Sequence, residues 1–482
     1  MAFKEETKLP LKLLVDKERN RVVVAEAGGE LVDILFSFLT LPLGTIIRLL
    51  SNKHGKDEAK EIGCINNLYR SVESSGDEIL WNKICKRMLL SPRNPCEELC
   101  QKLKLNVDDT EPIKYFMCSN KCQRGSDYVL STFAEASCSC GKLMDKQMKL
   151  YGNSNKGSHA DGVFVKGETI YLIFDDLRVL QSSLGKSVQQ LLQLGYKNFH
   201  NLTEKSLNVG LNEILDILKQ ALTSQSPLSD VLLGNGECKK VWTFSPKHRP
   251  KDQDRIDSNS HINLKVTVRK LKETILYAEA EGDFVDFLFS FLTTPLGCIL
   301  KLLDGNFSMG CMNNLYKSVK DLNPSWFTRS LGTTPLLNLQ VAPQFSCGKQ
   351  PTQLCEENIP NYWYSMSTTS SNGVISKEYS QIQRPSLMKL FEPRSPNGTK
   401  KSTVGFVRRP SLFVVWDDLQ VTPLANTSSI SLLQKLNVPL DDLEEHELRL
   451  EEIEALNLMG ASLTSKAALT EGLFYLLKKP KA

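Results

Sequence analysis

"LVDILFSFLTLPLGTIIRLL", residues 31–50, is a run of twenty residues that contains only two charges, Asp33 and Arg48. Its composition is that of either a membrane-spanning helix or a buried part of a protein core. A spanning helix needs about 20 predominantly apolar residues to cross the hydrocarbon layer of a membrane. The uncharged part of this run, residues 34–47, is shorter than that. We therefore expect the run to lie in a protein core and not in a membrane.

Pro42 divides the run into two parts. Proline lacks the N–H that a helix interior requires and clashes with the preceding turn, but it fits well at the start of a helix. The sequence therefore predicts two short buried helices, at about residues 30–39 and 42–50. Thr40, close to the break, is a candidate N-cap of the second helix.

The run occurs a second time. Residues 284–303 read "FVDFLFSFLTTPLGCILKLL" and agree with the first run at fourteen of twenty positions, which chance does not explain. Further blocks repeat in the same order along the chain: 21–30 with 274–283, 63–72 with 310–319, and 164–179 with 406–421. The chain is therefore predicted to be a tandem duplication of two similar α/β (α+β) units, each a mixture of sheet and helices.

The last pair of blocks reads "FVKGETIYLIFDDLRV" and "FVRRPSLFVVWDDLQV". Alternating and then continuous apolar residues around Gly167 and Arg409 predict two strands joined by a tight turn, the second of them buried on both faces.

The domain boundaries follow from composition. Residues 245–261 are polar, charged and contain proline, which is typical of an exposed linker. The first unit then covers residues 8–244, with a cysteine-rich insertion at about 91–150. The second unit covers residues 262–477, with a Ser- and Pro-rich, mobile loop at about 365–401.

The charge and the cysteine content limit the classes of function and the cellular compartment that can be expected. Lys plus Arg number 59 and Asp plus Glu number 55, so the chain has no strong positive field and is not expected to bind nucleic acid. The N-terminus lacks the features of a secretory signal. Thirteen cysteines, an odd number in a long chain, indicate reduced thiols and a soluble protein of the cytoplasm or nucleus.

The best chemical candidate is a group of four cysteines in the first unit, Cys118, Cys122, Cys138 and Cys140, spaced C-x3-C-x15-C-x-C. Four thiolates complete a tetrahedral zinc site and leave no open position for a substrate, so such a zinc ion would be structural. The alternative is a set of free cysteines in an irregular insertion. No other cofactor is predicted.

The second unit does not repeat this pattern. It keeps Cys347 but has only Cys355 nearby, so it is expected to bind no zinc. Cys96 and Cys100 lie four residues apart and are interpreted as packing residues of one helix face.

The blocks "AEAGGELVDILFSFLTLPLGTI", "GCINNLYRSV" and "FDDLRV", together with the cysteine cluster, resemble the plant family of uncharacterised proteins called domain of unknown function 674. The resemblance covers nearly the whole chain. It implies a plant protein, often built from two such units, and it carries over no activity.

Each unit also has a pair of adjacent carboxylates, Asp175 with Asp176 and Asp417 with Asp418. Adjacent carboxylates can bind a hard cation or act in acid–base chemistry. Aspartate is also common where a strand leaves a sheet, and a turn or helix cap is the preferred interpretation.

No complete catalytic set is found, so no catalytic residue is named. We therefore expect a non-enzymatic binding or scaffold protein with an unidentified protein partner. The alternative is an enzyme of unknown type with a cleft lined by Asp175, Asp176 and Glu26. Convergence of these residues and Asn66 in one pocket would favour an enzyme, whereas separate local roles would favour a binding protein.

Overall fold

A computed structural model shows the fold of the chain. It describes residues 7–54, 62–76, 79–124, 127–151, 162–235, 242–247, 261–304, 306–328, 332–347, 351–352, 356–365, 373–395, 405–424, 434 and 438–477.

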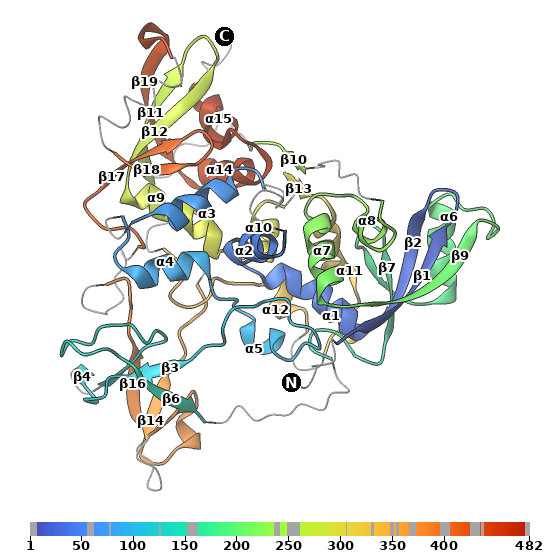
Figure 1. Cartoon of the computed structure of the whole chain (residues 1–482), viewed down its shortest axis with the longest axis horizontal. Helices are drawn as coiled ribbons and strands as arrows, with labels where there is room; N and C mark the ends of the chain where they lie inside the picture. Colours follow the sequence, from blue (N-terminus) through green and yellow to red (C-terminus); the bar gives the residue numbers. More distant parts are fainter. Residues whose placement is uncertain are drawn as a thin grey trace.

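Two five-stranded sheets have the same strand order, and they lie at opposite sides of the helices in Figure 1. The first sheet has the order β8-β7-β2-β1-β9, with strands Val179–Gln181, Ile170–Phe174, Arg21–Gly28, Leu9–Asp16 and Leu202–Val209. The second has the order β18-β17-β12-β11-β19, with strands Val421–Pro423, Leu412–Trp416, Thr274–Glu281, Ile262–Arg269 and Leu443–Leu450. The mixed α/β class is thus confirmed, and origin by duplication stays a prediction from the repeated sequence.

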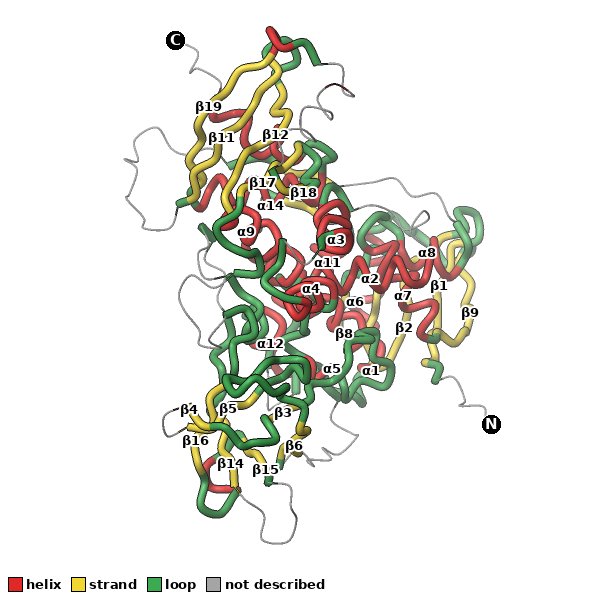
Figure 2. Tube along the Cα trace, turned by 60° about the vertical axis from the view of Figure 1, so that its left-hand side comes forward, coloured by secondary structure: helices red, strands yellow, loops and turns green. Residues whose placement is uncertain are grey.

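Figure 2 shows the helices of both halves in red. The first half contains α1 (Gly29–Ser37), α2 (Leu43–His54), α3 (Ile65–Ser74), α4 (Lys83–Leu90), α5 (Glu97–Cys100), α6 (Leu184–Gln193), α7 (Leu211–Ala221) and α8 (Pro227–Leu232). The second half contains α9 (Gly282–Thr293), α10 (Leu296–Leu302), α11 (Cys311–Asp321), α12 (Thr334–Leu337), α14 (Glu452–Thr464) and α15 (Ala468–Leu473).

The apolar run of the first half forms α1, a short 3-10 turn at Phe38–Thr40, and α2. Every residue from 31 to 47 is buried, which confirms the predicted pair of core helices. The proposed N-cap is wrong, because α2 begins only at Leu43 and the Thr40 hydroxyl accepts its hydrogen bond from the side-chain amide of Asn94, at 3.0 Å. In the described part of the chain, no helix has the length and apolar character needed to cross a membrane.

The two proline breaks meet at the centre of the molecule. The backbone N–H of Leu43 donates to the Thr294 carbonyl at 3.2 Å, and that of Leu296 donates to the Leu41 carbonyl at 3.0 Å. Pro42 and Pro295 therefore form a short antiparallel bridge between the halves.

Glycine permits this close approach. A Cβ atom on Gly44 would lie 3.1 Å from the carbonyl oxygen of Leu292, and one on Gly297 would lie 3.1 Å from that of Leu39. These are backbone atoms, which cannot move aside as a flexible side chain can. A larger residue at either position would push the two halves apart.

Each half also places one helix against the sheet of the other half. Helix α3 packs against α9 and β18, and α11 packs against α1 and β8. The side-chain amide of Asn67 donates to the Asp418 carbonyl at 2.9 Å, and that of Asn314 donates to the Asp176 carbonyl at 3.0 Å. The repeated Asn residues thus join the halves in both directions.

The strand–turn–strand unit expected around Gly167 and Arg409 is not formed. Instead, the backbone N–H groups of residues 163–165 donate to the buried carboxylate of Asp33 at 2.7 to 2.8 Å. In the second half, Asp286 accepts from the N–H groups of residues 406 and 407. These donors are taken by a buried carboxylate, and the segments make only single antiparallel bridges, Val165 with Phe327 and Val407 with Leu80. The actual hairpin is β7–β8. Strand β7 is buried on both faces, as predicted.

A third sheet contains strands from both halves. Its order is β3-β6-β15-β14-β16-β5-β4, with strands Tyr115–Met117, Lys146–Leu150, Val374–Ser376, Tyr362–Ser365, Ser386–Leu390, Asp127–Leu130 and Gln123–Arg124. Backbone bonds between Phe116 and Ser131, at 2.7 and 2.8 Å, link β3 to the end of β5. The sheet therefore closes on itself into a small structure that we call the barrel, at the lower left of Figure 1.

The barrel has its own small core and the same pairings in both halves. Tyr115 of β3 lies opposite Met148 of β6, and Tyr362 of β14 lies opposite Met388 of β16. The two tyrosine rings pack against each other with centroids 5.3 Å apart. Strands β3, β5 and β6 therefore correspond to β14, β15 and β16.

This arrangement differs from two expectations. Residues 91–150 are not an unmatched insertion, because the second half supplies the corresponding strands. The range 365–401, expected as a mobile loop, includes β15 and β16 among its described residues. Most of the expected linker at 245–261 lies outside the described residues, so the boundaries of the two units stay a prediction.

The exchange of helices predicts that the halves stay together when the chain is cut between them. We expect that a protease site placed at residues 250–256 can be cleaved without separating the fragments, because both halves contribute to one core and one barrel. Size-exclusion chromatography before and after cleavage checks this, with the same sample in denaturant as the control. Two half-sized species in native buffer would contradict the prediction.

Candidate metal centre

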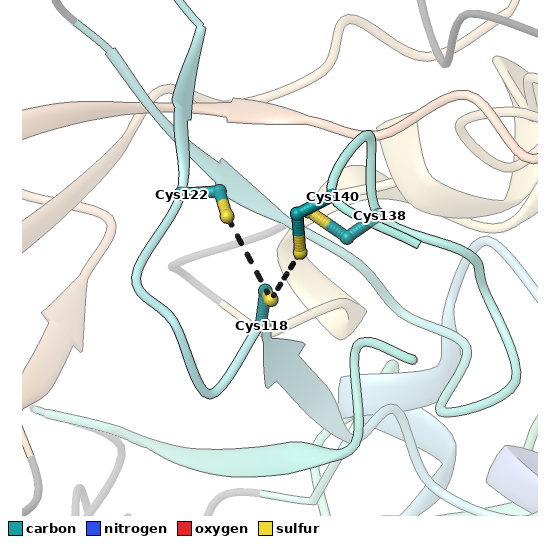
Figure 3. A group of neighbouring side chains, drawn as sticks. All are labelled: Cys118, Cys122, Cys138 and Cys140. Carbon is teal, nitrogen blue, oxygen red and sulfur yellow. Dashed lines mark hydrogen bonds between the residues drawn. The ribbon is translucent and has the colours of Figure 1, made fainter. Parts of the chain in front are cut away.

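Four cysteines gather where the barrel closes (Figure 3). Cys118 follows β3, and Cys122 immediately precedes β4. Cys138 and Cys140 belong to the connection between β5 and β6. The chain thus brings together two short turns that are sixteen residues apart in the sequence.

Backbone hydrogen bonds shape both turns. In the first, the N–H of Lys121 donates to the Cys118 carbonyl at 2.8 Å. In the second, the N–H of Gly141 donates to the Cys138 carbonyl at 2.9 Å, and Gly141 has a positive φ of 84°. Glycine adopts this conformation without steric cost, so Gly141 lets the chain reverse directly after Cys140.

The sulfur atoms have the spacing of a tetrahedral thiolate site. All four lie within 4.8 Å of one another. The Cys118 sulfur is 3.5 Å from that of Cys140 and 3.9 Å from that of Cys122. A zinc ion with four Zn–S bonds of roughly 2.3 Å places its sulfurs about 3.8 Å apart. The four predicted ligands are therefore together, in a geometry that fits zinc.

Solvent reaches the four thiols unequally. Cys118 and Cys138 are buried, Cys122 is half-buried and Cys140 is exposed. The backbone N–H of Lys142 stabilises the Cys140 thiolate and lowers its pKa to about 6. Metal ions bind the thiolate and not the thiol, so this hydrogen bond prepares Cys140 as a ligand.

The second half has no described counterpart of this group. Cys347 is buried, and its thiol donates to the carbonyl of Asp286 in α9 at 3.1 Å, outside the barrel strands. Cys355 lies outside the described residues. The position that corresponds to Cys118 at the end of β14 is occupied by Ser365. Cys96 and Cys100 are buried, in agreement with their interpretation as packing residues.

The carboxylate pairs have local structural roles. Asp175 accepts hydrogen bonds from the backbone N–H and the hydroxyl of Ser229, at 2.8 and 2.7 Å, and so caps α8. Asp417 accepts the same two bonds from Thr470 of α15, both at 2.8 Å. Burial raises the pKa of Asp175, and it raises that of Asp417 to about 6.

Asp175 and Asp176 do face a small cavity of about 150 Å³ in the first half. Each is paired there with an arginine: Asp175 with Arg21 at 3.2 Å and Asp176 with Arg178 at 2.8 Å. Each carboxylate among the described residues that line this cavity is therefore paired with an arginine.

The other residues of the enzyme alternative lie elsewhere. Glu26 is not among the described residues that line this cavity; it lies 4.0 Å from Lys12 on the sheet surface. Asn66 accepts a hydrogen bond from the Ile62 N–H at 2.9 Å. In the second half, Glu279 lines a groove of about 650 Å³ whose described lining includes neither Asp417 nor Asp418. The structure therefore does not bring these residues together.

Sequence reasoning missed the two carboxylates with the most extensive structural role, Asp33 and Asp286. Both lie inside an apolar run and are only 2% exposed. Burial raises the pKa of each to about 6. Backbone hydrogen bonds oppose that rise at Asp33, and the charge of Arg409 followed by backbone hydrogen bonds opposes it at Asp286. A charged residue at the same place in both copies of an otherwise apolar run was the available signal.

Comparison with known proteins confirms the resemblance noted in the repeated blocks. The sequence model of the family described as "Protein of unknown function (DUF674)" matches residues 5–453. No curated protein and no solved structure matches the chain.

The capping roles predict the effect of removing each carboxylate. We expect Asp175→Ala and Asp417→Ala each to lower the free energy of unfolding by about 1–3 kcal/mol, because a helix cap is lost and buried donors are left unsatisfied. Urea denaturation followed by circular dichroism measures this. Glu26→Ala, on the surface, is the control and should change stability by less than about 0.5 kcal/mol. Equal stability of all three variants would contradict the capping roles.

Proposed function

Because the chain belongs to the DUF674 family, whose function is unknown, we propose its role from its own geometry: a non-enzymatic binding or scaffold protein with one structural zinc ion. The observation that carries this proposal is the group of four thiols at the closure of the barrel. The ion would hold the turn that follows β3 against the connection between β5 and β6. Its four ligands would be Cys118, Cys122, Cys138 and Cys140.

The chemistry of the donor set supports zinc in a structural role. Four thiolates favour a soft or borderline ion over magnesium or calcium, which prefer oxygen ligands. A complete set of four protein ligands leaves no position at which water or a substrate could be activated. The two halves pair the same barrel strands, yet among the described residues only the first half brings four cysteines together, so zinc would order the edge of the barrel and not the fold as a whole.

The carboxylates support a binding role over an enzymatic one. Asp175 and Asp417 each hold the start of a helix, and Asp176 is paired with Arg178. Glu26 lies apart from them. A general acid or base has to be within hydrogen-bond reach of a reacting group, and these side chains do not share a pocket.

The cysteine content supports the expected compartment. The chain has thirteen cysteines, an odd number spread over a long sequence, which does not suit a framework of disulfides. Reduced cysteines are typical of the cytoplasm and nucleus. We propose one of these compartments, and a protein partner in place of nucleic acid or lipid.

Metal analysis tests the zinc site. Purified protein should contain one zinc ion per chain, and the double variant Cys138→Ser, Cys140→Ser should contain none, because two of the four ligands are removed. Ser139→Ala, in the same exposed turn, is the matched control and should keep the metal. Wild-type protein without zinc, or zinc that persists in the double variant, would contradict the assignment.

Affinity capture tests the binding role. Tagged protein, incubated with an extract of the organism that encodes it, should retain one specific partner protein in an amount close to its own molar amount. The double variant Cys138→Ser, Cys140→Ser should retain less of this partner, because the edge of the barrel is no longer ordered. Quantitative mass spectrometry of both captures, with Ser139→Ala as the control, provides the comparison. The absence of any partner at near-equal amount would count against the scaffold role.

A further inference from the structure

The proposed zinc site exposes one of its ligands far more than the others. Cys118 and Cys138 are only 2% and 7% exposed, whereas Cys140 lies on the exposed side of its turn beside the exposed Ser139. A reagent dissolved in water therefore meets the Cys140 sulfur first. This inequality is a property of the fold, because Gly141 reverses the chain directly after Cys140 and keeps that residue at the surface, where its sulfur is 3.8 Å from the side-chain amide of the exposed Asn120.

The exposed sulfur also has a buried sulfur beside it. The Cys140 and Cys118 sulfurs are 3.5 Å apart. A disulfide bond is about 2.05 Å long, so the two atoms need to approach by only about 1.5 Å. Residues 139–143 of the Cys140 turn are exposed, so Cys140 is the more accessible of the two partners for such a movement.

We propose that this centre is an oxidation-sensitive metal site, in which a peroxide attacks Cys140 and the product forms a disulfide with Cys118. This regulatory role rests on the zinc site proposed above. Of the four ligands, Cys140 is the residue that reacts first with peroxide, which we call the trigger residue. Cys118 is the resolving residue, which then forms the disulfide with it.

The chemistry balances in two steps. The Cys140 thiolate attacks one oxygen of hydrogen peroxide; the O–O bond breaks, a sulfenic acid forms, and the second oxygen leaves as water after it takes up a proton. The Cys118 thiolate then attacks the Cys140 sulfur and expels the hydroxyl group, which also takes up a proton and leaves as water. Two thiolates are oxidised by two electrons in total, and one peroxide is reduced to two waters.

The disulfide removes two of the four zinc ligands. Cys122 and Cys138 alone do not complete a tetrahedral site, so the zinc ion leaves. The turn after Cys118 stays attached through the new bond, whereas Cys122 and the adjoining strand β4 lose their link to the rest of the centre. The barrel core of Tyr115, Tyr362 and their neighbours remains, because it does not depend on the metal ligands. Oxidation thus loosens one edge of the barrel and not the whole fold.

The test follows zinc release during titration of the zinc-loaded, full-length protein with hydrogen peroxide, using a chromophoric zinc chelator. We expect one zinc released per peroxide consumed, and a peptide map in which the first disulfide joins Cys118 to Cys140. A dithiol reductant with added zinc should restore the metal content. A first disulfide between any other pair of cysteines would overturn the proposal.

A variant separates oxidation at Cys140 from mere loss of a ligand. Cys140→His keeps a metal-binding side chain that peroxide does not convert to a sulfenic acid, so zinc release should slow by about tenfold or more. Ser139→Ala should release zinc at the wild-type rate. Release from Cys140→His at the wild-type rate would overturn the trigger role. Purified wild-type protein without zinc contradicts the proposed function itself, whereas zinc that is present and retained under peroxide contradicts only the oxidation step.

Discussion

The backbones of the two halves are in direct contact where the proline-broken helices cross, and the rest of the structure depends on that contact. Gly44 and Gly297 allow it, because each faces a carbonyl oxygen of the opposite half. Because the two backbones approach so closely, a helix of each half packs against the sheet of the other half. The buried apolar residues of both halves form one continuous core. Neither half therefore completes its own hydrophobic packing.

The repeated blocks of the sequence acquire physical roles from this arrangement. The Asn of "NNLY" in one half binds the backbone of the "DD" turn in the other, as Asn67 does with Asp418. Ser71 of the same helix accepts the N–H of Val421, and Ser318 accepts that of Val179. The aspartate carboxylates meanwhile hold helices α8 and α15. In each pair that resembles a catalytic pair in the sequence, the first carboxylate thus caps a helix of its own half, and the backbone carbonyl of the second residue bonds to the other half.

Much of the fold was predictable from local sequence patterns. The apolar runs and Pro42 predicted the paired core helices, and the cysteine spacing predicted which four thiols would meet. The strand expected before Gly167 was wrong, because a distant carboxylate, Asp33, satisfies its backbone donors. The barrel was missed because its strands have two to five residues each and pair with strands far along the chain. Local periodicity contains no information about such partners, nor about which cysteine faces solvent.

The cysteines stand on only one of the two corresponding sides of the barrel, where the other side has Ser365. Among the described residues, only the cysteine-bearing side has a group of thiols that could hold a metal ion. Loss or gain of such an ion would therefore alter one side of the barrel and leave the corresponding side unchanged.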